Sequence, residues 1–405
     1  MPMMKDEERQ PLLGQQAVQN AAETTREDHG KTSKWTSIFP QIQVTDPRFR
    51  FLPLIGCLTV LVNEGEYFFK QIGYFRAVEA LYCIEYYHVH DPVVAHLGKA
   101  IPENMCKIDS IQKKVATANG IVLLVRMTSA FIGTMIVGYL ADMYGRRLPL
   151  ILHKVGTIIY TVVVASTYLG YPYLPIWVSF CGGLGGLIGA NFDLNLAILL
   201  AAYNDALTSS TQVATYFFIT TSMQYVGQVS FPLLAGKAIN MDGKGGTPHV
   251  SLFISLGMAA AGLVISVLFF PETMKKSEPP DGPDLSDNGG DGKRKGIKAM
   301  IAAKAKSIQE GFQRSVQGVG ATNVILLIVA MFLATTAIKA VDWLGLIQYP
   351  VIKFGWKYNQ STFAMAIQAV IYIFTYFILL PTYNKLGARY GFSPSSTSLT
   401  IMLFQ

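Results

Sequence analysis

Six ionisable side chains lie inside stretches of the sequence that are otherwise almost entirely apolar. A charged group at the centre of a bilayer costs at least about 2.5–3.5 kcal/mol, so those that remain usually face a wet cavity or an oppositely charged partner. Groups of this kind can bind a charged solute, carry a proton or neutralise one another. The six residues are Glu64, Glu66, Arg126, Asp193, Lys339 and Asp342.

The two glutamates, Glu64 and Glu66, lie in the outer part of the apolar stretch 51–70, and either could carry a proton. A carboxyl group that is removed from water favours its neutral form, which lets it gain and lose a proton near neutral pH. Glu66 also stands four residues before Lys70, the spacing of an ion pair on one face of a helix. The sequence leaves both interpretations of Glu66 open.

Arg126 belongs to a second apolar stretch, 117–142. If each helical residue adds about 1.5 Å, this arginine lies about 15 Å from the outer end, near the membrane midplane. A guanidinium there could hold a carboxylate or phosphate of a solute. The alternative is a structural pair with Asp193 or with a glutamate of the first stretch. Lys339 and Asp342 are three residues apart, share one helix face and could simply neutralise each other.

Long apolar helices must position these residues, and the composition predicts such helices. Of the 405 residues, 51% are hydrophobic and only 15% are charged, against about 25% charged in soluble proteins. Crossing a bilayer takes about 20 apolar residues. The sequence therefore predicts an all-α polytopic membrane protein. Its predicted spans are 51–70, 117–142, 149–170, 176–202, 212–237, 249–270, 321–349 and 361–381, with a ninth that starts near residue 396.

The predicted spans divide the chain into two bundles. Arg48 and Arg50 precede the first span, and cytoplasmic segments of membrane proteins are rich in Lys and Arg, so we predict a cytosolic N-terminus. Between the bundles, residues 297–315 have a basic, amphipathic pattern typical of a helix on the membrane surface. The predicted segments are a disordered cytosolic tail (1–47), a six-helix bundle (48–272), a cytosolic linker with the amphipathic helix (273–320) and a partial second bundle (321–405).

The N-terminal tail carries one short pattern that concerns sorting. Glu8 precedes the paired leucines Leu12 and Leu13, an arrangement that resembles an acidic dileucine signal. An adaptor protein could read this signal and route the protein to a vacuole or lysosome. The alternative is a solvated tail without such a role. We predict a multi-pass protein of the vacuolar or plasma membrane.

The four cysteines fall into two groups. Cys57 and Cys181 lie within predicted spans and are expected to be packing residues. Cys83 and Cys106 fall in one predicted external loop, 71–116. An oxidising environment on that side favours a disulfide between them, and two free thiols are the alternative.

Several other classes of function are disfavoured by what the sequence contains. The net charge of +7 needs no nucleic acid, because basic residues of a membrane protein gather at its cytoplasmic face. The glycine-rich stretch 181–190 lacks the lysine and the strand of a phosphate-binding loop, and small residues in an apolar helix usually mark close helix packing. The sequence shows no nucleophile–base pair, Cys/His metal cluster or cofactor motif. We therefore predict no enzyme, no metal and no cofactor.

The turn between the second and third predicted spans carries the most specific pattern, Gly-x-Leu-Ala-Asp-x-x-Gly-Arg-Arg at residues 138–147. Its first glycine, Gly138, would let a neighbouring helix approach closely because it has no side chain. Its second glycine, Gly145, suits a tight turn, where a positive φ is expected.

The charged residues of this turn suggest a latch. Asp142 could accept hydrogen bonds from a nearby helix start, while Arg146 and Arg147 would hold the turn on the cytoplasmic side. We hypothesise that Arg146 or Arg147 pairs with Asp205, after the fourth span, and that this latch favours one conformation. An Asp142→Asn variant with unchanged activity, and with no shift in the balance of its conformations, would contradict the hypothesis.

This register of glycine, acid, glycine and paired arginines resembles the signature loop of the major facilitator superfamily, between its second and third helices. A degenerate second copy lies at 381–391, where Ala388 stands in the position of the acid. The runs 82–92 and 349–356 resemble fungal members that are distantly similar to the proton-coupled folate transporter.

The resemblance implies twelve helices in two pseudo-symmetric halves, with a solute site at the membrane midplane and alternating access by rocking of the halves. In the family, helices 1, 4 and 7 line the central cavity, and five of the six ionisable candidates fall on those helices. Two departures stand out. Gln212 occupies a position where relatives often carry arginine, and the sequence stops in the ninth helix, so helices ten to twelve are expected to be missing.

The resemblance implies a secondary active transporter of a small organic solute. The sequence has no ATP-binding motif, so the energy must come from a gradient, and we predict proton coupling. The alternative is a non-transporting or truncated membrane protein with a receptor-like or regulatory role, which the missing helices would favour. The predicted partners are the lipid bilayer, a small-molecule substrate, protons and, through the tail, sorting adaptors.

Overall fold

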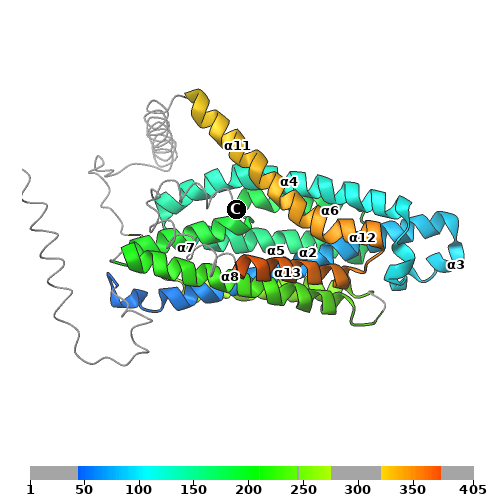
Figure 1. The fold of residues 1–405 in the computed structure, drawn as a ribbon, viewed down its shortest axis with the longest axis horizontal. Helices are drawn as coiled ribbons and strands as arrows, with labels where there is room; N and C mark the ends of the chain where they lie inside the picture. The colour runs from blue at the N-terminus through cyan, green and yellow to red at the C-terminus, as the bar shows by residue number, and fades with distance from the viewer. Residues whose placement is uncertain (1–43, 209, 244–245, 275–320, 375–405) are drawn as a thin grey trace, which may run out of the picture.

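The computed structural model describes residues 44–208, 210–243, 246–274 and 321–374, which form one elongated helical bundle (Figure 1). Nearly all of these residues are helical, and no strand occurs among them. The architecture agrees with the predicted all-α membrane fold. The predictions for the sorting signal, the amphipathic helix, the second signature copy and the ninth span all lie outside the described residues.

Long helices dominate the described chain and run along the long axis of the molecule (Figure 1). In chain order the elements are η1 (Pro47–Phe49), α2 (Leu52–His90), α3 (Pro92–Ala95), η2 (Gly98–Ala100), η3 (Glu103–Cys106), α4 (Asp109–Tyr144), α5 (Arg147–Gly170), α6 (Val178–Cys181), η4 (Gly182–Ile188), α7 (Phe192–Ala206), α8 (Ser210–Ile239), α9 (Pro248–Val264), η5 (Ile265–Phe269), α11 (Ala321–Ala340), η6 (Val341–Gln348), α12 (Tyr349–Phe354) and α13 (Tyr358–Phe374). Some short helices, such as α3, lie at an end of the bundle, and others, such as η4, pack within it.

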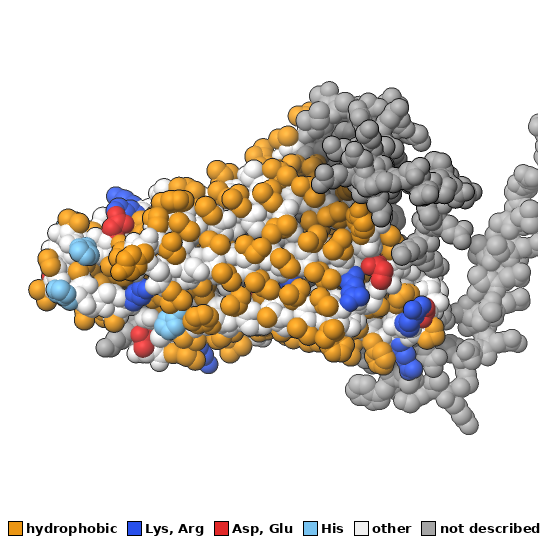
Figure 2. Space-filling view, turned by 180° about the vertical axis from the view of Figure 1, so that it is seen from behind, with side chains coloured by type: hydrophobic (Ala, Val, Ile, Leu, Met, Phe, Trp, Pro, Cys, Tyr) orange, Lys and Arg blue, Asp and Glu red, His pale blue; other side chains and the backbone are white. Residues whose placement is uncertain are grey.

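Four stretches of the described chain are helical, long and apolar enough to cross a membrane: α4, α5, α6 through α7, and α9 with η5. Their apolar side chains cover the outside of the bundle as well as its interior. Figure 2 shows hydrophobic side chains along one face of the molecule and charged side chains gathered toward its two ends. This distribution supports helices that span a bilayer, with polar ends in water.

The first helix is much longer than the predicted span. Helix α2 has 39 residues and continues to His90, so the predicted external loop 71–116 shrinks to the residues between α2 and α4. The sequence had predicted a polar loop from residue 71 onward. In the structure, Arg76 and Glu79 are both 0% exposed and pair with each other at 3.0 Å. Burial of these charges is tolerated because each has an oppositely charged, hydrogen-bonded partner.

The predicted span 176–202 is also not a continuous helix. Its glycine run forms the 3-10 helix η4, and the chain then breaks at Gly189, whose φ of 98° is left-handed. The run packs tightly, as predicted: the carbonyl oxygen of Gly186 leaves no room for a Cβ on Gly133 of α4. This close backbone approach, rather than continuation of the helix, determines the local structure.

The two predicted halves share part of one core. The largest hydrophobic cluster combines buried residues of α2 and α5 with Ile347, Val351, Tyr358 and Met365 from η6, α12 and α13. Helix α13 packs along α8, and η6 contacts α4. Helix α11 diverges from the bundle, and its own N-terminal end lies farthest away (Figure 1).

Candidate functional site

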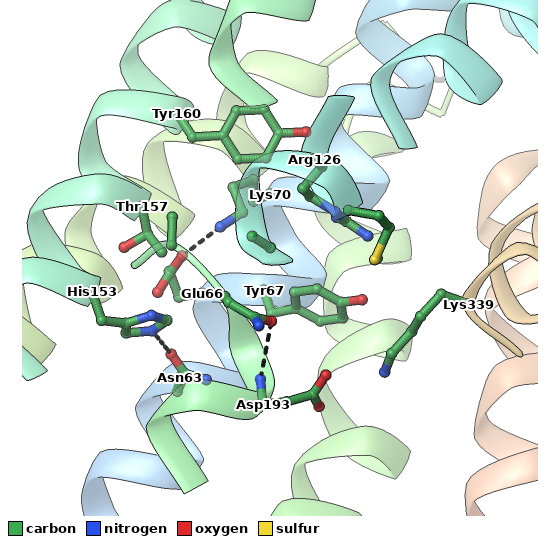
Figure 3. Close-up of a pocket in the computed structure, with 14 residues that line it drawn as sticks. Asn63, Glu66, Tyr67, Lys70, Arg126, His153, Thr157, Tyr160, Asp193 and Lys339 are labelled. Carbon is green, nitrogen blue, oxygen red and sulfur yellow. Dashed lines mark hydrogen bonds and ion pairs between the residues drawn. The ribbon is translucent and has the colours of Figure 1, made fainter. Parts of the chain in front are cut away.

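A pocket opens where helices of the first half meet α11 of the second (Figure 3). Four of the six ionisable candidates line it, one each from α2, α4, α7 and α11. These residues lie far apart in the sequence, and the high cost of burying a lone charge favours their meeting at one pocket. The lining residues are Asn63, Glu66, Tyr67, Lys70, Arg126, Met127, Ala130, His153, Thr157, Tyr160, Ala190, Asn191, Asp193 and Lys339.

Glu66 binds two lysines at the wall of this pocket. Its Oε1 accepts a hydrogen bond from Lys70 Nζ at 2.7 Å, and its Oε2 accepts one from Lys154 Nζ at 3.2 Å. All three side chains are almost completely buried. The pair with Lys70 was one of the two interpretations that the sequence left open. The pair with Lys154 was not predicted.

Lys154 also connects this ion-pair cluster to a buried histidine. Its Nζ donates to Asn63 Oδ1 at 2.7 Å, and the same oxygen lies 2.8 Å from His153 Nε2. The other ring nitrogen of His153 lies 2.8 Å from the carbonyl oxygen of Gly189. The helix break at Gly189 therefore supplies a free carbonyl group that orients the imidazole.

The pocket wall on the other side holds Arg126, which donates to Gln71 Oε1 at 2.9 Å and lies 5.9 Å from the centre of the Tyr67 ring. Asp193 lies in the first turn of α7, and Lys339 extends toward it from α11 (Figure 3). This arrangement brings a cation of each half to one pocket. The side chain of Asp342 lies outside the described structure, so its predicted neutralisation of Lys339 stays a prediction.

Glu64 does not line the pocket. It is 0% exposed, faces Gly227 of α8, and neither carboxylate oxygen has a hydrogen-bond partner within the described structure. The side-chain amides of Gln224 and Gln228 of α8 also lie beside it, and Lys339 and Asp193 are the charged side chains that act on it.

The predicted cytosolic turn forms a compact charged cluster. Arg146 donates from Nη1 to Asp142 at 2.8 Å and from Nε to Asp205 at 3.0 Å, the pairing that the latch hypothesis proposed. Burial alone would lower the pKa of Arg146, but the hydrogen bonds to both aspartates outweigh it and raise that pKa above its usual value. The guanidinium therefore stays charged at any physiological pH.

Glu272 completes this turn and was not identified as a site residue from the sequence. Its carboxylate accepts hydrogen bonds from the backbone N–H groups of Arg146 at 2.9 Å and of Arg147 at 3.2 Å, where α5 begins. A carboxylate at the start of a helix accepts hydrogen bonds from free N–H groups and interacts favourably with the positive end of the helix dipole. Gly145 has a φ of 98°, the positive value expected for the turn.

One residue of the turn does not have the role predicted for it. Apart from the adjacent backbone of its own helix, no atom of the described structure lies within 4 Å of a Cβ placed on Gly138, so this glycine makes no close contact with another helix. Gly133, earlier on the same helix, makes that contact instead. The cluster also lies within the first half: Asp142, Asp205 and Glu272 all precede the linker.

Sequence reasoning missed Lys154 and His153, although both lie in a predicted span, 149–170. The rule that selected the six ionisable candidates would have selected these two residues as well. It also missed the charged residues at the outer end of α2, because the helix was taken to end before them.

Several characterised transporters are similar to this chain. The MFS-type transporter aprT of Aspergillus flavus is 28% identical over 209 residues, which are 50% of this chain and 39% of aprT. The MFS efflux pump atnC of Emericella nidulans is 24% identical over 297 residues, covering 73% of this chain and 54% of atnC. The class H tetracycline resistance protein of Pasteurella multocida is 24% identical over 289 residues, covering 69% and 60%.

The chain thus spans 39–60% of the length of these relatives. No protein-family model matches it, and no solved structure does. The relatives are named as transporters, efflux pumps and a resistance protein, and the more distant likeness to the folate transporter stays a prediction. Together with the apolar helices, these similarities support an integral, multi-pass, all-α membrane protein that is similar to MFS transporters over half or more of its length.

Proposed function

We propose that this protein is a secondary active transporter that moves a small organic solute by alternating access, coupled to protons. The pocket at the junction of the two halves carries this proposal, because its lining combines Glu66, Arg126 and Asp193 of the first half with Lys339 of the second. Charged groups buried at such a junction mark solute pathways in membrane proteins. A solute held there touches both halves, so its binding can influence their relative motion.

The charges of the pocket support a solute with a carboxylate or phosphate group. Glu66 is shared by Lys70 and Lys154, so this buried cluster carries one more positive charge than negative. Arg126 adds a guanidinium, whose planar fork of donors suits an oxyanion. The aromatic rings of Tyr67 and Tyr160 offer apolar contact for the rest of the molecule.

Glu64 is the proposed proton carrier. It lies outside the pocket but is coupled to Lys339 and Asp193 through their charges. A buried carboxyl without a hydrogen-bond partner releases its proton when a nearby positive charge becomes available to stabilise the anion. Movement of Lys339 with the second half would supply such a change.

We propose export as the direction of transport, because the relative atnC is named an efflux pump. We also propose a cytosolic N-terminus. Sorting adaptors that recognise Glu8, Leu12 and Leu13 would direct the protein to the vacuolar or plasma membrane. The non-transporting alternative is not favoured, because the relatives cover half or more of this chain and are named for transport. Their names describe no catalysis, in line with the prediction of no enzyme.

The test is proton movement in proteoliposomes that contain the full chain and a pH-sensitive dye. Benzoate, citrate, glucose-6-phosphate, glucose and choline serve as probes across acidic, neutral and basic solutes. We expect at least one acid to change the internal pH, and Glu64→Gln to abolish this change while solute exchange continues. The control Glu85→Gln alters a solvent-facing glutamate that pairs with Lys114 outside the pocket. Solute movement that is identical with and without an uncoupler would refute proton coupling.

A further inference from the structure

Four charged side chains form a second buried cluster at the outer end of the bundle, away from the pocket. Glu79 accepts hydrogen bonds from Arg76 at 3.0 Å and Lys107 at 2.7 Å, and Glu103 pairs with Lys107 at 2.9 Å. Arg76 and Glu79 are 0% exposed and Glu103 is 1% exposed. With two cations and two anions, these four side chains balance one another's charge.

The two members of this cluster that come from the outer loop, Glu103 and Lys107, are held rigidly. They flank Cys106, which forms a disulfide with Cys83 of α2. The carbonyl oxygen of Cys106 also accepts a hydrogen bond from the side-chain amide of Gln112 at 3.0 Å. A disulfide and hydrogen bonds on the same short segment leave the two side chains little freedom to move.

This loop contacts the second half at the start of α13. Glu103 Oε1 accepts a hydrogen bond from the backbone N–H of Tyr358 at 2.7 Å, which satisfies one of the free amides of a helix start. Lys107 Nζ lies 4.4 Å from the centre of the Tyr358 ring, and the ring of Phe75 stacks on it at 6.1 Å. The first residue of α13 is therefore held by three side chains of the first half.

We infer that Glu103 and Lys107 are positioning residues that clamp α13 at the outer end, and that this clamp must release before the pocket opens to that side. Its chemistry suits repeated release. When Tyr358 leaves, Glu103 keeps its ion pair with Lys107, so no charge is left buried and unpaired. The freed N–H group belongs to a helix start and can bind water instead.

The clamp is distinct from the pocket, and its consequence for transport rests on the proposed function. Its position can be tested without any solute. The distance between spin labels at Lys113→Cys on α4 and Lys353→Cys on α12 reports the separation of the two halves at this end. Both positions are exposed, and Cys57→Ser with Cys181→Ser removes the two free thiols.

We expect one short distance in the parent protein and a new, longer component in Glu103→Ala. Glu103→Gln keeps an oxygen that can accept from Tyr358, so its longer component should be smaller. Glu85→Gln is the matched control, because it breaks an exposed ion pair at the same end that involves only α2 and α4. Cys83→Ser with Cys106→Ser should also lengthen the distance, since the loop then loses its covalent anchor.

The inference is wrong if Glu103→Ala gives the parent distances while the protein keeps its melting temperature, or if Glu85→Gln shifts the distances equally. Should Glu103→Ala simply unfold, Glu103→Gln and Lys107→Met decide, because both keep the shape of the side chain. A shifted distance without any solute movement would support the clamp and count against the proposed transport function. Parent distances together with normal transport would support the proposed transport function and count against the clamp.

Discussion

At the scale of single residues, the two-to-one ratio of lysine to glutamate in the pocket wall has an energetic consequence. Lys70 and Lys154 are each within hydrogen-bond distance of Glu66, and Lys154 has a second acceptor in Asn63. Removing one cation leaves a balanced pair, whereas removing the anion leaves two buried cations that repel each other. The two kinds of substitution should therefore differ strongly in cost.

We expect Glu66→Gln to lower the free energy of unfolding by about 3–5 kcal/mol, the usual cost of leaving a buried charge without its partner. Lys154→Met should cost clearly less, because Glu66 keeps Lys70 and the methionine fills a similar volume. Thermal melting of the purified protein in detergent measures both. Lys114→Met, at an exposed lysine, is the control.

An equal loss for the two pocket variants would mean that charge balance does not govern this cluster. The double variant Glu66→Gln with Lys154→Met sharpens the test, because it again leaves a single cation, Lys70. It should recover part of the stability lost in Glu66→Gln alone. Strict additivity of the two losses would contradict the coupling that the contacts show.

At the scale of elements, glycine positions on α4 decide where helices can touch. A Cβ on Gly133 would overlap the carbonyl oxygen of Gly186 in η4, whereas a Cβ on Gly138 would meet open space. We expect Gly133→Ala to destabilise the protein by about 1–3 kcal/mol, since backbone must move to make room. Gly138→Ala should be neutral or stabilising by up to about 1 kcal/mol, because alanine favours a helix.

The measurement is again the melting temperature, with both variants compared on one background. The two substitutions have the same chemistry and lie on the same helix, so their difference isolates the contact with η4. Loss of stability in Gly138→Ala, with none in Gly133→Ala, would support the sequence-based role of Gly138 and contradict the structure.

The turn between α4 and α5 gives a further comparison between elements. Asp205 is 25% exposed and Asp142 is 74% exposed, although both pair with Arg146. Because water screens the more exposed pair, we expect Asp205→Asn to cost about 1 kcal/mol of stability and Asp142→Asn to cost less. Thermal melting at low and high salt measures both losses of stability. A larger loss in Asp142→Asn than in Asp205→Asn would contradict the prediction that the less exposed pair contributes more.

Sequence periodicity and hydropathy predicted the limits of the mostly apolar spans well, and predicted poorly the limits of helices that contain buried charges. Helices α5 and α9 with η5 end close to their predicted limits because both are long, mostly apolar stretches. The prediction for α2 was wrong because Arg76 and Glu79 are paired within the helix and with Lys107, a residue from another segment. Such a partner can be recognised only when the chain is folded.

The pocket could be predicted in part for a similar reason. The cost of charge in an apolar stretch depends on local sequence alone, and it led to Glu66, Arg126, Asp193 and Lys339, which do converge. It also led to Glu64, which faces α8 instead, because two residues along a helix point to different sides. Orientation around the helix axis depends on packing, which the sequence does not display.

At the scale of the whole molecule, the Cys83–Cys106 disulfide and the turn between α4 and α5 lie at opposite ends of the bundle. Helix α4 connects them with 36 residues, a length of about 54 Å. The hydrocarbon core of a bilayer is only about 30 Å thick. Both ends of α4 should therefore project into water, one with the clamp and one with Asp142 and Arg146.

This geometry predicts opposite accessibility for the two ends in sealed membrane vesicles. Single cysteines at His96 in the outer loop and at Tyr144 in the turn, both exposed, can be labelled with a membrane-impermeant maleimide after Cys57 and Cys181 are replaced by serine. One site should react before permeabilisation and the other only afterwards. Tyr144→Cys should behave like a tag on the N-terminus, because the predicted tail is cytosolic and the signature turn lies on the same side. Labelling of both sites from one side would mean that α4 does not cross the membrane, and the pocket beside it could then not serve as a path across the bilayer.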